Sequence, residues 1–403
     1  MIPITLREFI EEHRNDDVRQ LALEANRYVG VDMRAALVQI SGWQKACEKL
    51  PSWARLSDII YPEKLSLEQC SSEATSLYKL QLAERLCPIH HDRLTDLTGG
   101  LAVDGSMLAR HFSHYLYVER LETLCDIANH NLPLLGIKNF EVVNGCCEDV
   151  IPTLPIQDLI YADPARRDDI GRKVVGIRDC TPDMTLVADE LLSKCSYLMI
   201  KLSPMIEAKT VVELLPRVVE VHVVALDGEC KEVLLVMQGK VMSEGLAPLR
   251  MYAVNIKSRG TDETFVFEPA EERSSEYFLA DKIDEYLYEP NAAVMKAGAY
   301  KLLARTFGVG QLDAKTHLYT SEHLMDDFPG RKFKVVEVTD FSKKALKSFF
   351  AGLSCCNLSV RNFPATVAEL RKRLNMKEGG DDYVFATTFR GSKMLVKCRK
   401  TSM

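Results

Sequence analysis

The chain has 403 residues, of which 47% are hydrophobic and 27% charged, and its formal net charge is −6. This length exceeds what one hydrophobic core usually organises, so we expect two or three domains. The ordinary composition excludes a disordered or fibrous protein, and the negative net charge excludes a uniformly basic coat for nucleic acid.

Residues 1 to 86 are predicted to form a helical region. From residue 4 onward, apolar positions such as Leu6, Phe9 and Leu80 recur near helical spacing among charged residues. The first 13 residues lack the basic start and unbroken apolar core of a secretory signal, and no apolar run approaches the roughly 20 residues that span a bilayer. We therefore expect a cytoplasmic protein that does not enter a membrane, with a helical region that packs onto the next domain or shapes a substrate entrance.

An α/β domain is predicted over residues 87–243, because short apolar segments alternate there with helical ones. We expect helices over 105–112 and 122–135, and a hairpin of strands 218–225 and 232–237 that turns at Asp227 and Gly228. Such alternation is typical of a sheet with helices on both faces. The other predicted strands are 93–97, 115–119, 140–144, 158–162 and 197–201.

A second α+β part is predicted beyond this domain, divided into segments 244–330 and 331–403. In the first segment we expect strands over 251–257 and 264–267 and one helix over 292–305. In the second, a helix is expected to begin at Pro364, where the missing N–H of proline is not needed. The other elements expected there are a strand over 333–338, a helix over 342–351, a strand over 357–360 and two strands that end at Arg399.

Charge is unevenly divided along the chain. Residues 331–403 contain 16 Lys and Arg against 6 Asp and Glu, a net charge of +10, so the remainder carries −16. This predicts an acidic body with a basic appendage. A basic face that contacts RNA phosphates is one interpretation, and an ordinary solvated face is the other. The candidate residues are Arg361, Arg371, Lys372, Arg373, Lys393, Lys397 and Arg399.

The twelve cysteines and nine histidines show no metal-binding pattern. No C-x-x-C pair occurs, and two of the cysteine pairs are adjacent in sequence, which favours reduced, buried thiols. The histidines lack the spacing of zinc ligands on a helix. We expect no metal.

A glycine-rich turn from Asp96 to Asp104 follows the first predicted strand and leads into a helix. Glycines let the backbone turn tightly and approach a ligand, and the start of a helix offers unpaired N–H groups. The second strand ends at Glu119, 23 residues after Asp96, where a carboxylate can accept both hydroxyls of an adenosine ribose. The turn lacks G-x-G-x-x-G, so a methyl donor fits better than a dinucleotide. The alternative is that the turn binds no ligand and only connects the strand tightly to the helix.

The segment Asp163-Pro-Ala-Arg166-Arg167 directly follows the apolar strand 158–162. In open α/β sheets the ligand crevice lies outside the carboxyl ends of the strands, so this loop should face whatever Asp96 and Glu119 hold. Pro164 restricts Asp163 to an extended backbone.

With these motifs the chain resembles the class I S-adenosylmethionine-dependent methyltransferases, and within them a bacterial branch with a THUMP-like domain. The resemblance implies a helical start, a Rossmann-like methyltransferase domain, a ferredoxin-like unit and a THUMP-like end, and covers nearly the whole chain. Its motifs are residues 94–101 (LTDLTGGL), 117–119 (YVE), 159–167 (LIYADPARR), 200–205 (IKLSPM) and 378–388 (EGGDDYVFATT).

The resemblance also implies residue roles. Many relatives carry an acidic residue where Cys146 stands, so Glu148 or Asp149 could meet the adenine instead. Many also carry a third glycine where Ala102 stands, and the alanine leaves less room there. The residues assigned to S-adenosylmethionine are Asp96, Thr98, Gly99, Gly100, Asp104, Glu119, Arg120, Gly145, Cys146 and Asp163.

The Asp163 loop resembles the Asp-Pro-Pro-aromatic motif of amino methyltransferases that act on adenine or guanine. There the acidic side chain accepts a hydrogen bond from the exocyclic amine and the ring stacks on the base; Arg166 stands in the ring's place and offers a guanidinium. The predicted catalytic residues are Tyr161, Asp163, Pro164 and Arg166, and the predicted substrate-binding residues are Arg166, Arg167, Lys201 and Ser203.

The predicted function is S-adenosylmethionine-dependent methylation of a base in structured RNA. Two alternatives remain open: a methyltransferase for a small molecule or a protein, and a non-enzymatic RNA-binding scaffold with an inactive methyltransferase fold. The fold alone does not decide among them. The sequence also leaves open which RNA and atom are modified, and the oligomeric state.

Overall fold

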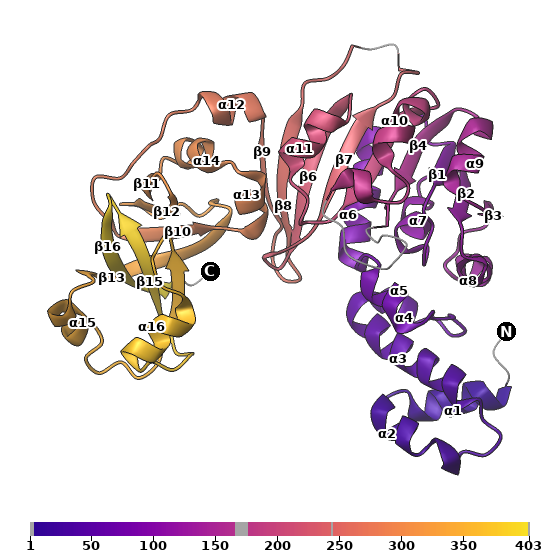
Figure 1. The fold of residues 1–403 in the computed structure, drawn as a ribbon, viewed down its shortest axis with the longest axis horizontal. Coiled ribbons are helices and arrows are strands. Elements are labelled where there is room, and N and C mark those ends of the chain that lie inside the picture. The colour runs from indigo at the N-terminus through magenta and orange to yellow at the C-terminus, as the bar shows by residue number, and fades with distance from the viewer. Residues whose placement is uncertain (1–3, 166–175, 243–244, 402–403) are drawn as a thin grey trace. The chain divides into compact units, whose positions relative to one another are not determined.

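The computed structural model describes residues 4–165, 176–242 and 245–401. The chain divides into two compact units, one made of 1–221 with 232–248 and the other of 222–231 with 249–403, so the boundary runs through one β-hairpin (Figure 1). Within the described ranges, no helix is long and apolar enough to cross a membrane. The four-segment division expected from the sequence is finer than these two units and stays a prediction.

The first unit begins with the helices predicted from the sequence. Asp17, Asp32 and Ser72 cap three of them, each accepting backbone N–H groups of the first turn. Trp53 and Leu67 pack in one core with Leu101 and Val103 of the following domain, so the later helices are part of the same unit. The helices are α1 (Ile4–His13), α2 (Val18–Leu23), α3 (Met33–Lys49), α4 (Pro51–Ala54), α5 (Lys64–Gln69) and α6 (Glu73–Leu86).

A nine-stranded sheet follows, in the order β3-β2-β1-β4-β5-β7-β6-β8-β9. Strands β1 to β5 pair in parallel, and β7 pairs with β5 antiparallel. This confirms the predicted α/β fold with a Rossmann-like sheet. The strands of the first part are β1 (Arg93–Asp96), β2 (His114–Glu119), β3 (Phe140–Asn144), β4 (Gln157–Ala162), β5 (Cys195–Leu202), β6 (Val218–Leu226) and β7 (Glu229–Gln238).

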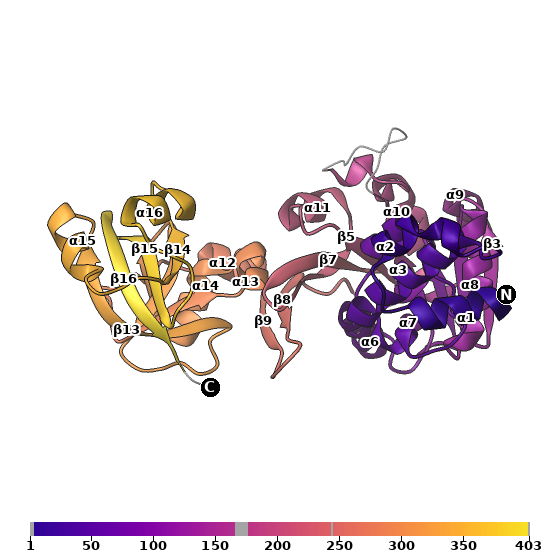
Figure 2. The same ribbon diagram turned by 90° about the horizontal axis from the view of Figure 1, so that it is seen from below.

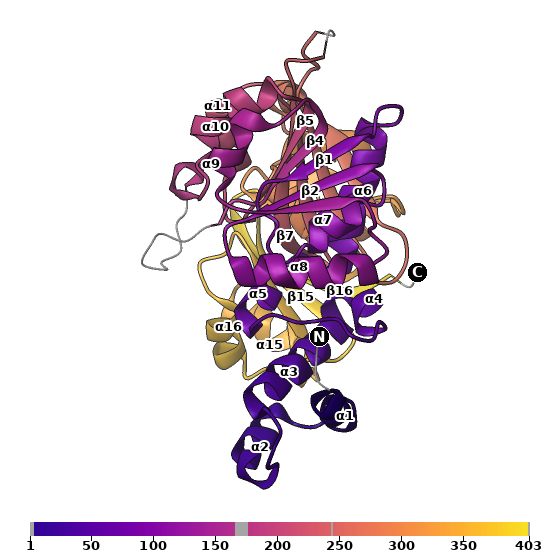
Figure 3. The same ribbon diagram turned by 90° about the vertical axis from the view of Figure 1, so that its right-hand side faces the viewer.

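Helices cover both faces of this sheet. In Figures 2 and 3, α10 (Met184–Leu192) and α11 (Ala208–Leu214) lie on one face, and α6 and α7 (Val103–Leu108) lie on the other. Strand β4 is therefore buried on both sides from Leu159 to Ala162, which explains why these four residues are apolar. The chain also forms α8 (Glu122–Leu134) and α9 (Cys147–Val150).

The second unit carries β8 and β9 and a seven-stranded sheet of order β11-β12-β10-β13-β16-β15-β14. Leu346 and Phe349 of α15 and Leu370 of α16 belong to one buried cluster with Val384 and Leu395 of the sheet. The elements are β8 (Arg250–Ile256), β9 (Glu263–Phe267), α12 (Pro269–Ser274), β10 (Tyr286–Pro290), α13 (Ala292–Ala297), α14 (Tyr300–Phe307), β11 (Gly310–Asp313), β12 (Thr316–Ser321), β13 (Gly330–Asp340), α15 (Lys343–Phe349), β14 (Asn357–Arg361), α16 (Val367–Leu374), β15 (Asp382–Phe389) and β16 (Ser392–Lys400).

Two predictions for this unit are wrong. The single helix expected over 292–305 is two helices, because Gly298 adopts a left-handed conformation (φ +80°) that ends α13. The helix expected from Pro364 begins at Val367 instead, since Thr366 caps it by accepting the Glu369 N–H at 3.2 Å.

All twelve cysteines are free thiols, and seven of them are buried.

Candidate active site

The strand order reverses between β1 and β4, and the predicted site residues lie at the carboxyl edge beside this reversal. Asp96 ends β1, Glu119 ends β2 and Asp163 follows β4. The Asp163 N–H donates to Thr98 Oγ1 at 2.6 Å, which ties the loop after β4 to the turn after β1. Such a switch point is where open α/β sheets bind ligands.

The glycine turn is built against β2. A Cβ on Gly99 would come within 2.1 Å of the Tyr117 ring, so packing excludes any side chain at position 99. Gly100 adopts a left-handed backbone (φ +53°), its carbonyl accepts the Tyr117 hydroxyl at 2.6 Å, and its N–H donates to Glu119 Oε2 at 3.0 Å. The turn is therefore shaped by two side chains of the neighbouring strand.

Two backbone N–H groups hold the carboxylate of Glu119, one at each oxygen. Its Oε1 accepts the Leu121 N–H at 2.9 Å, and its Oε2 accepts the Gly100 N–H. Because a carboxylate offers about four lone-pair positions, two remain for further donors. The Gly145 N–H donates to the Glu119 carbonyl at 3.0 Å, which brings the loop after β3 to the same place. Arg120 and Cys146 beside it are exposed.

Asp96 is 1% exposed, and its Oδ1 accepts the Thr98 N–H at 3.0 Å. Burial, opposed by that hydrogen bond, raises the pKa of Asp96 to about 8. Gly105 lies against it, since a Cβ there would come within 2.7 Å of Asp96 Oδ2. The end of β1 thus presents a carboxyl group that is mostly neutral at pH 7.

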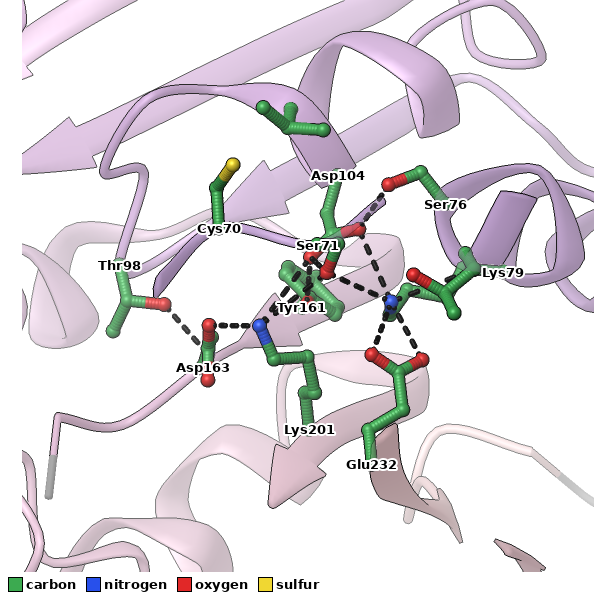
Figure 4. A network of polar contacts seen from close by, with 12 residues as sticks. Cys70, Ser71, Ser76, Lys79, Thr98, Asp104, Tyr161, Asp163, Lys201 and Glu232 are labelled. Carbon is green, nitrogen blue, oxygen red and sulfur yellow. Dashed lines mark hydrogen bonds and ion pairs between the residues drawn. The ribbon is translucent and has the colours of Figure 1, made fainter. Parts of the chain in front are cut away.

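Asp104, at the start of α7, is the centre of a buried polar network (Figure 4). Burial acts to raise its pKa, but two lysines and the serine hydroxyls outweigh burial and hold the pKa of Asp104 far below its ordinary value. The groups around its carboxylate are Ser76 Oγ at 2.6 Å, Ser71 Oγ at 2.7 Å, Tyr161 Oη at 2.7 Å, Lys79 Nζ at 3.1 Å and Lys201 Nζ at 3.7 Å.

Lys79 and Glu232 extend the network inward, and neither was predicted from the sequence. Lys79 Nζ lies 2.7 and 2.8 Å from the two oxygens of Glu232 on β7, and the two side chains are 0% and 3% exposed. A weak signal existed, since Lys79 shares the buried face of α6 with Ser76 and Ala83. The helical region therefore supplies part of this network.

Lys201, at the end of β5, joins the network to the site. Its ammonium group pairs with Asp163 Oδ2 and lies 3.4 Å from Ser71 Oγ. Burial acts to lower the pKa of Lys201, but Asp163 and Asp104 outweigh it and raise the pKa above the ordinary value. Lys201 is therefore a cation under all ordinary conditions.

The remaining predicted catalytic and substrate residues are placed as follows. The Tyr161 hydroxyl donates to Asp104, and burial raises its pKa well above the ordinary value, so the contacts give no support to a role as base. Ser203 is buried and its Oγ accepts the Met205 N–H at 3.2 Å. Pro164 lies in the loop beside Asp163. Arg166 and Arg167 lie outside the described residues.

Comparison with known proteins identifies the domains at the C-terminal end. A model of a ferredoxin-like domain matches residues 286–329, and a model described as THUMP domain-like matches residues 330–400. A search of curated proteins gave no match.

One solved structure is similar over nearly the whole chain. It is described as a "putative methyltransferase from Porphyromonas gingivalis W83", with 36% identity, a TM-score of 0.87, and coverage of 99% of this chain and 98% of that one. An O-methyltransferase from Bacillus cereus in complex with SAH has 13% identity and a TM-score of 0.34 over 45% of this chain and 94% of its own. An rRNA methylase from Streptococcus thermophilus has 13% identity and a TM-score of 0.31 over 40% and 94%. These two matches are too distant to carry an argument about activity. The Porphyromonas gingivalis structure is similar enough to show the family: the chain belongs to the THUMP-like domain family of class I methyltransferases.

Proposed function

We propose that this protein is an S-adenosylmethionine-dependent methyltransferase that acts on RNA. The observation that carries the proposal is the convergence of Asp96, Glu119 and Asp163 at the switch point of the sheet, with the hydrogen bonds of Thr98 and Gly100 linking their loops.

The chemistry of these residues fits the cofactor. Glu119 keeps two lone-pair positions for the two ribose hydroxyls. Asp96 and the turn at Gly99 and Gly100 would hold the methionine end, where a cation would favour ionisation of Asp96. S-adenosylmethionine would supply the methyl group. The loop at Gly145 and Cys146 would lie beside the adenine, with Arg120, Thr98 and Asp104 as the other predicted cofactor residues.

RNA as substrate is supported by the THUMP-like match and by the charge of residues 331–403. Ion pairs already involve several of the predicted basic residues, among them Arg361 with Glu289 and Lys397 with Glu337. Lys372 and Arg373 on α16 are exposed and are the better candidates for phosphate contacts. The two alternatives, a small-molecule or protein substrate and an inactive scaffold, are separated from this proposal by the experiment below.

The first test is calorimetric titration of S-adenosylmethionine into the wild type, Glu119→Ala and Glu122→Ala. Glu122 is an exposed carboxylate three residues further along, and so is the matched control. Loss of two hydrogen bonds to a charged group should weaken binding at least about tenfold in Glu119→Ala, whereas Glu122→Ala should bind like the wild type.

Transfer of labelled methyl groups to RNA from cells that lack the protein is the second test. Cofactor binding with transfer to RNA supports the proposal. Cofactor binding without transfer to RNA favours a small-molecule or protein substrate, and no cofactor binding in the wild type favours the scaffold.

A further inference from the structure

The pair formed by Lys201 and Asp163 is where the buried network reaches the surface. The Lys79 side chain is 0% exposed and cannot meet a substrate, whereas the side chains of Lys201 and Asp163 are 12% and 37% exposed. The Asp163 N–H bond to Thr98 Oγ1 keeps this pair beside the predicted cofactor turn. Any methyl acceptor that reaches Asp163 therefore also meets an ammonium group.

Hydrogen-bonding capacity distinguishes the possible acceptors. An exocyclic amine offers N–H donors and needs acceptors, but the lysine ammonium has three donors and no acceptor, and it occupies one oxygen of Asp163. A hydroxyl offers one donor and two lone pairs. It can donate to the second oxygen of Asp163, accept from Lys201 with one lone pair, and attack the methyl group with the other.

Charge leads to the same choice. An amine nitrogen becomes more positive as it takes a methyl group, and an ammonium beside it opposes this change. A hydroxyl oxygen becomes more negative as its proton leaves, and a fixed cation beside it stabilises that change.

We infer that the methyl acceptor of this site is a hydroxyl group, bound between Lys201 and Asp163. The inference rests on the proposed action on RNA, and it then specifies the ribose 2′-hydroxyl, because that is the only hydroxyl of an internal unmodified nucleotide. Lys201 and Asp163 are the catalytic residues, and Asp104, Lys79 and Glu232 are positioning residues that hold Lys201 in place. The base amine predicted from the sequence is the competing acceptor.

The proton has a path through Asp163. As the new O–C bond forms, the C–S bond of the donor breaks and its electron pair stays on sulfur. The hydroxyl proton passes to the oxygen of Asp163 that Lys201 does not occupy, while Lys201 donates a hydrogen bond to the reacting oxygen. Lys201 remains a cation throughout, and the protonated Asp163 returns its proton to solvent through its exposed side.

The product of the reaction tests the inference directly. Total RNA from cells that lack the protein is incubated with the full-length protein and tritium-labelled S-adenosylmethionine, then hydrolysed with alkali. A 2′-O-methyl group blocks alkaline cleavage, so we expect the label in alkali-resistant dinucleotides. Label in mononucleotides would mean base methylation, which overturns the hydroxyl while the proposed function stands. No label in RNA, with cofactor binding intact, overturns both the proposed action on RNA and the ribose acceptor.

Variants of Lys201 supply an independent test. Lys201→Met should reduce transfer about a hundredfold or more, the usual effect of losing a donor that stabilises developing negative charge, and leave cofactor affinity within about threefold by calorimetry. Lys201→Arg keeps a cation, so it should fold, bind cofactor and transfer faster than Lys201→Met.

The control is Lys240→Met, which removes an exposed lysine paired with Asp189 on α10 and should transfer like the wild type. If a folded Lys201→Met transfers methyl groups at the wild-type rate, or a folded Lys201→Arg transfers none, the assignment of Lys201 is wrong.

Discussion

Each of the two units contains a nearly buried carboxylate bridged by two cations, and the two carboxylates differ in what surrounds those cations. In the first unit, the Asp104 side chain is 9% exposed and lies between Lys79 and Lys201, whose side chains are 0% and 12% exposed. Protein groups have replaced almost all of the water around both cations.

In the second unit, the Glu289 side chain is 5% exposed and pairs with Arg331 and Arg361, whose side chains are 45% and 43% exposed. These guanidinium groups keep water on one side. Glu289 on β10 lies opposite Arg331 on β13 in the register of the sheet, so the cluster joins neighbouring strands.

The difference indicates different roles. A buried ion pair gains little net stability after desolvation, so the fully enclosed cluster is poor evidence of a stabilising device. It does fix the position of Lys201 beside Asp163, which is where we propose that methyl transfer occurs. The half-exposed cluster joins neighbouring strands and is expected to stabilise its sheet modestly.

The largest effect expected from this comparison is that of Asp104→Asn. Both oxygens of Asp104 receive donors, so the amide N–H₂ of an asparagine would face Ser76 or Ser71 in either orientation. Breaking such a buried charge pair typically costs about 3–5 kcal/mol. Urea unfolding followed by tryptophan fluorescence measures this cost selectively, because both tryptophans, Trp43 and Trp53, lie in the first unit. A cost below about 1 kcal/mol would contradict the claim that losing the Asp104 carboxylate is costly because Lys79 and Lys201 are buried around it.

Asp96 is expected to give a different kind of effect, a dependence of stability on pH. Its folded pKa of about 8 exceeds the ordinary value of 3.8, so between these two values the folded state holds a proton that the unfolded chain has lost. Stability should therefore fall as pH rises from about 4 to 8, by at most about 1.4 kcal/mol per unit, and then level off.

Asp96→Asn should remove this contribution while its amide oxygen still accepts the Thr98 N–H. The difference in unfolding free energy between the variant and the wild type, measured by tryptophan fluorescence from pH 5 to pH 9, should grow in favour of the variant up to pH 8. A difference that does not change with pH would show that Asp96 is ionised in the folded protein.

Local signals were enough to predict the sheet of the first unit. Strand β4 is apolar from Leu159 to Ala162 because helices cover both faces, and Asp96 and Glu119 were predicted as site residues because a carboxylate at the end of a strand combines with a glycine turn. Strand β12 was missed because Thr316 and Thr320 are polar yet buried, so the segment lacks the apolar pattern by which a buried strand is predicted.

The buried network could not be predicted in the same way. Lys79 and Glu232 are 153 residues apart, and only the order of the strands brings β7 close to α6. The start of α16 was misplaced for a smaller reason: both Pro364 and Thr366 suit a helix start, and the hydrogen bonds between Thr366 and Glu369 decide between them.

The smallest expected effect, and the closest match to Asp104→Asn, is that of Glu289→Gln. Both substitutions replace a buried carboxylate with its amide, but Arg331 and Arg361 can be rehydrated where they stand, and the glutamine oxygen still accepts from one of them. The cost should be about 1–2 kcal/mol, between that of an exposed ion pair and that of a buried one. Native-state hydrogen exchange of β10 and β13 measures it locally, since this unit has no tryptophan. If Glu289→Gln costs as much as Asp104→Asn, the exposure of the cations does not set the cost of losing the carboxylate, and the enclosure of Lys79 and Lys201 needs no functional explanation.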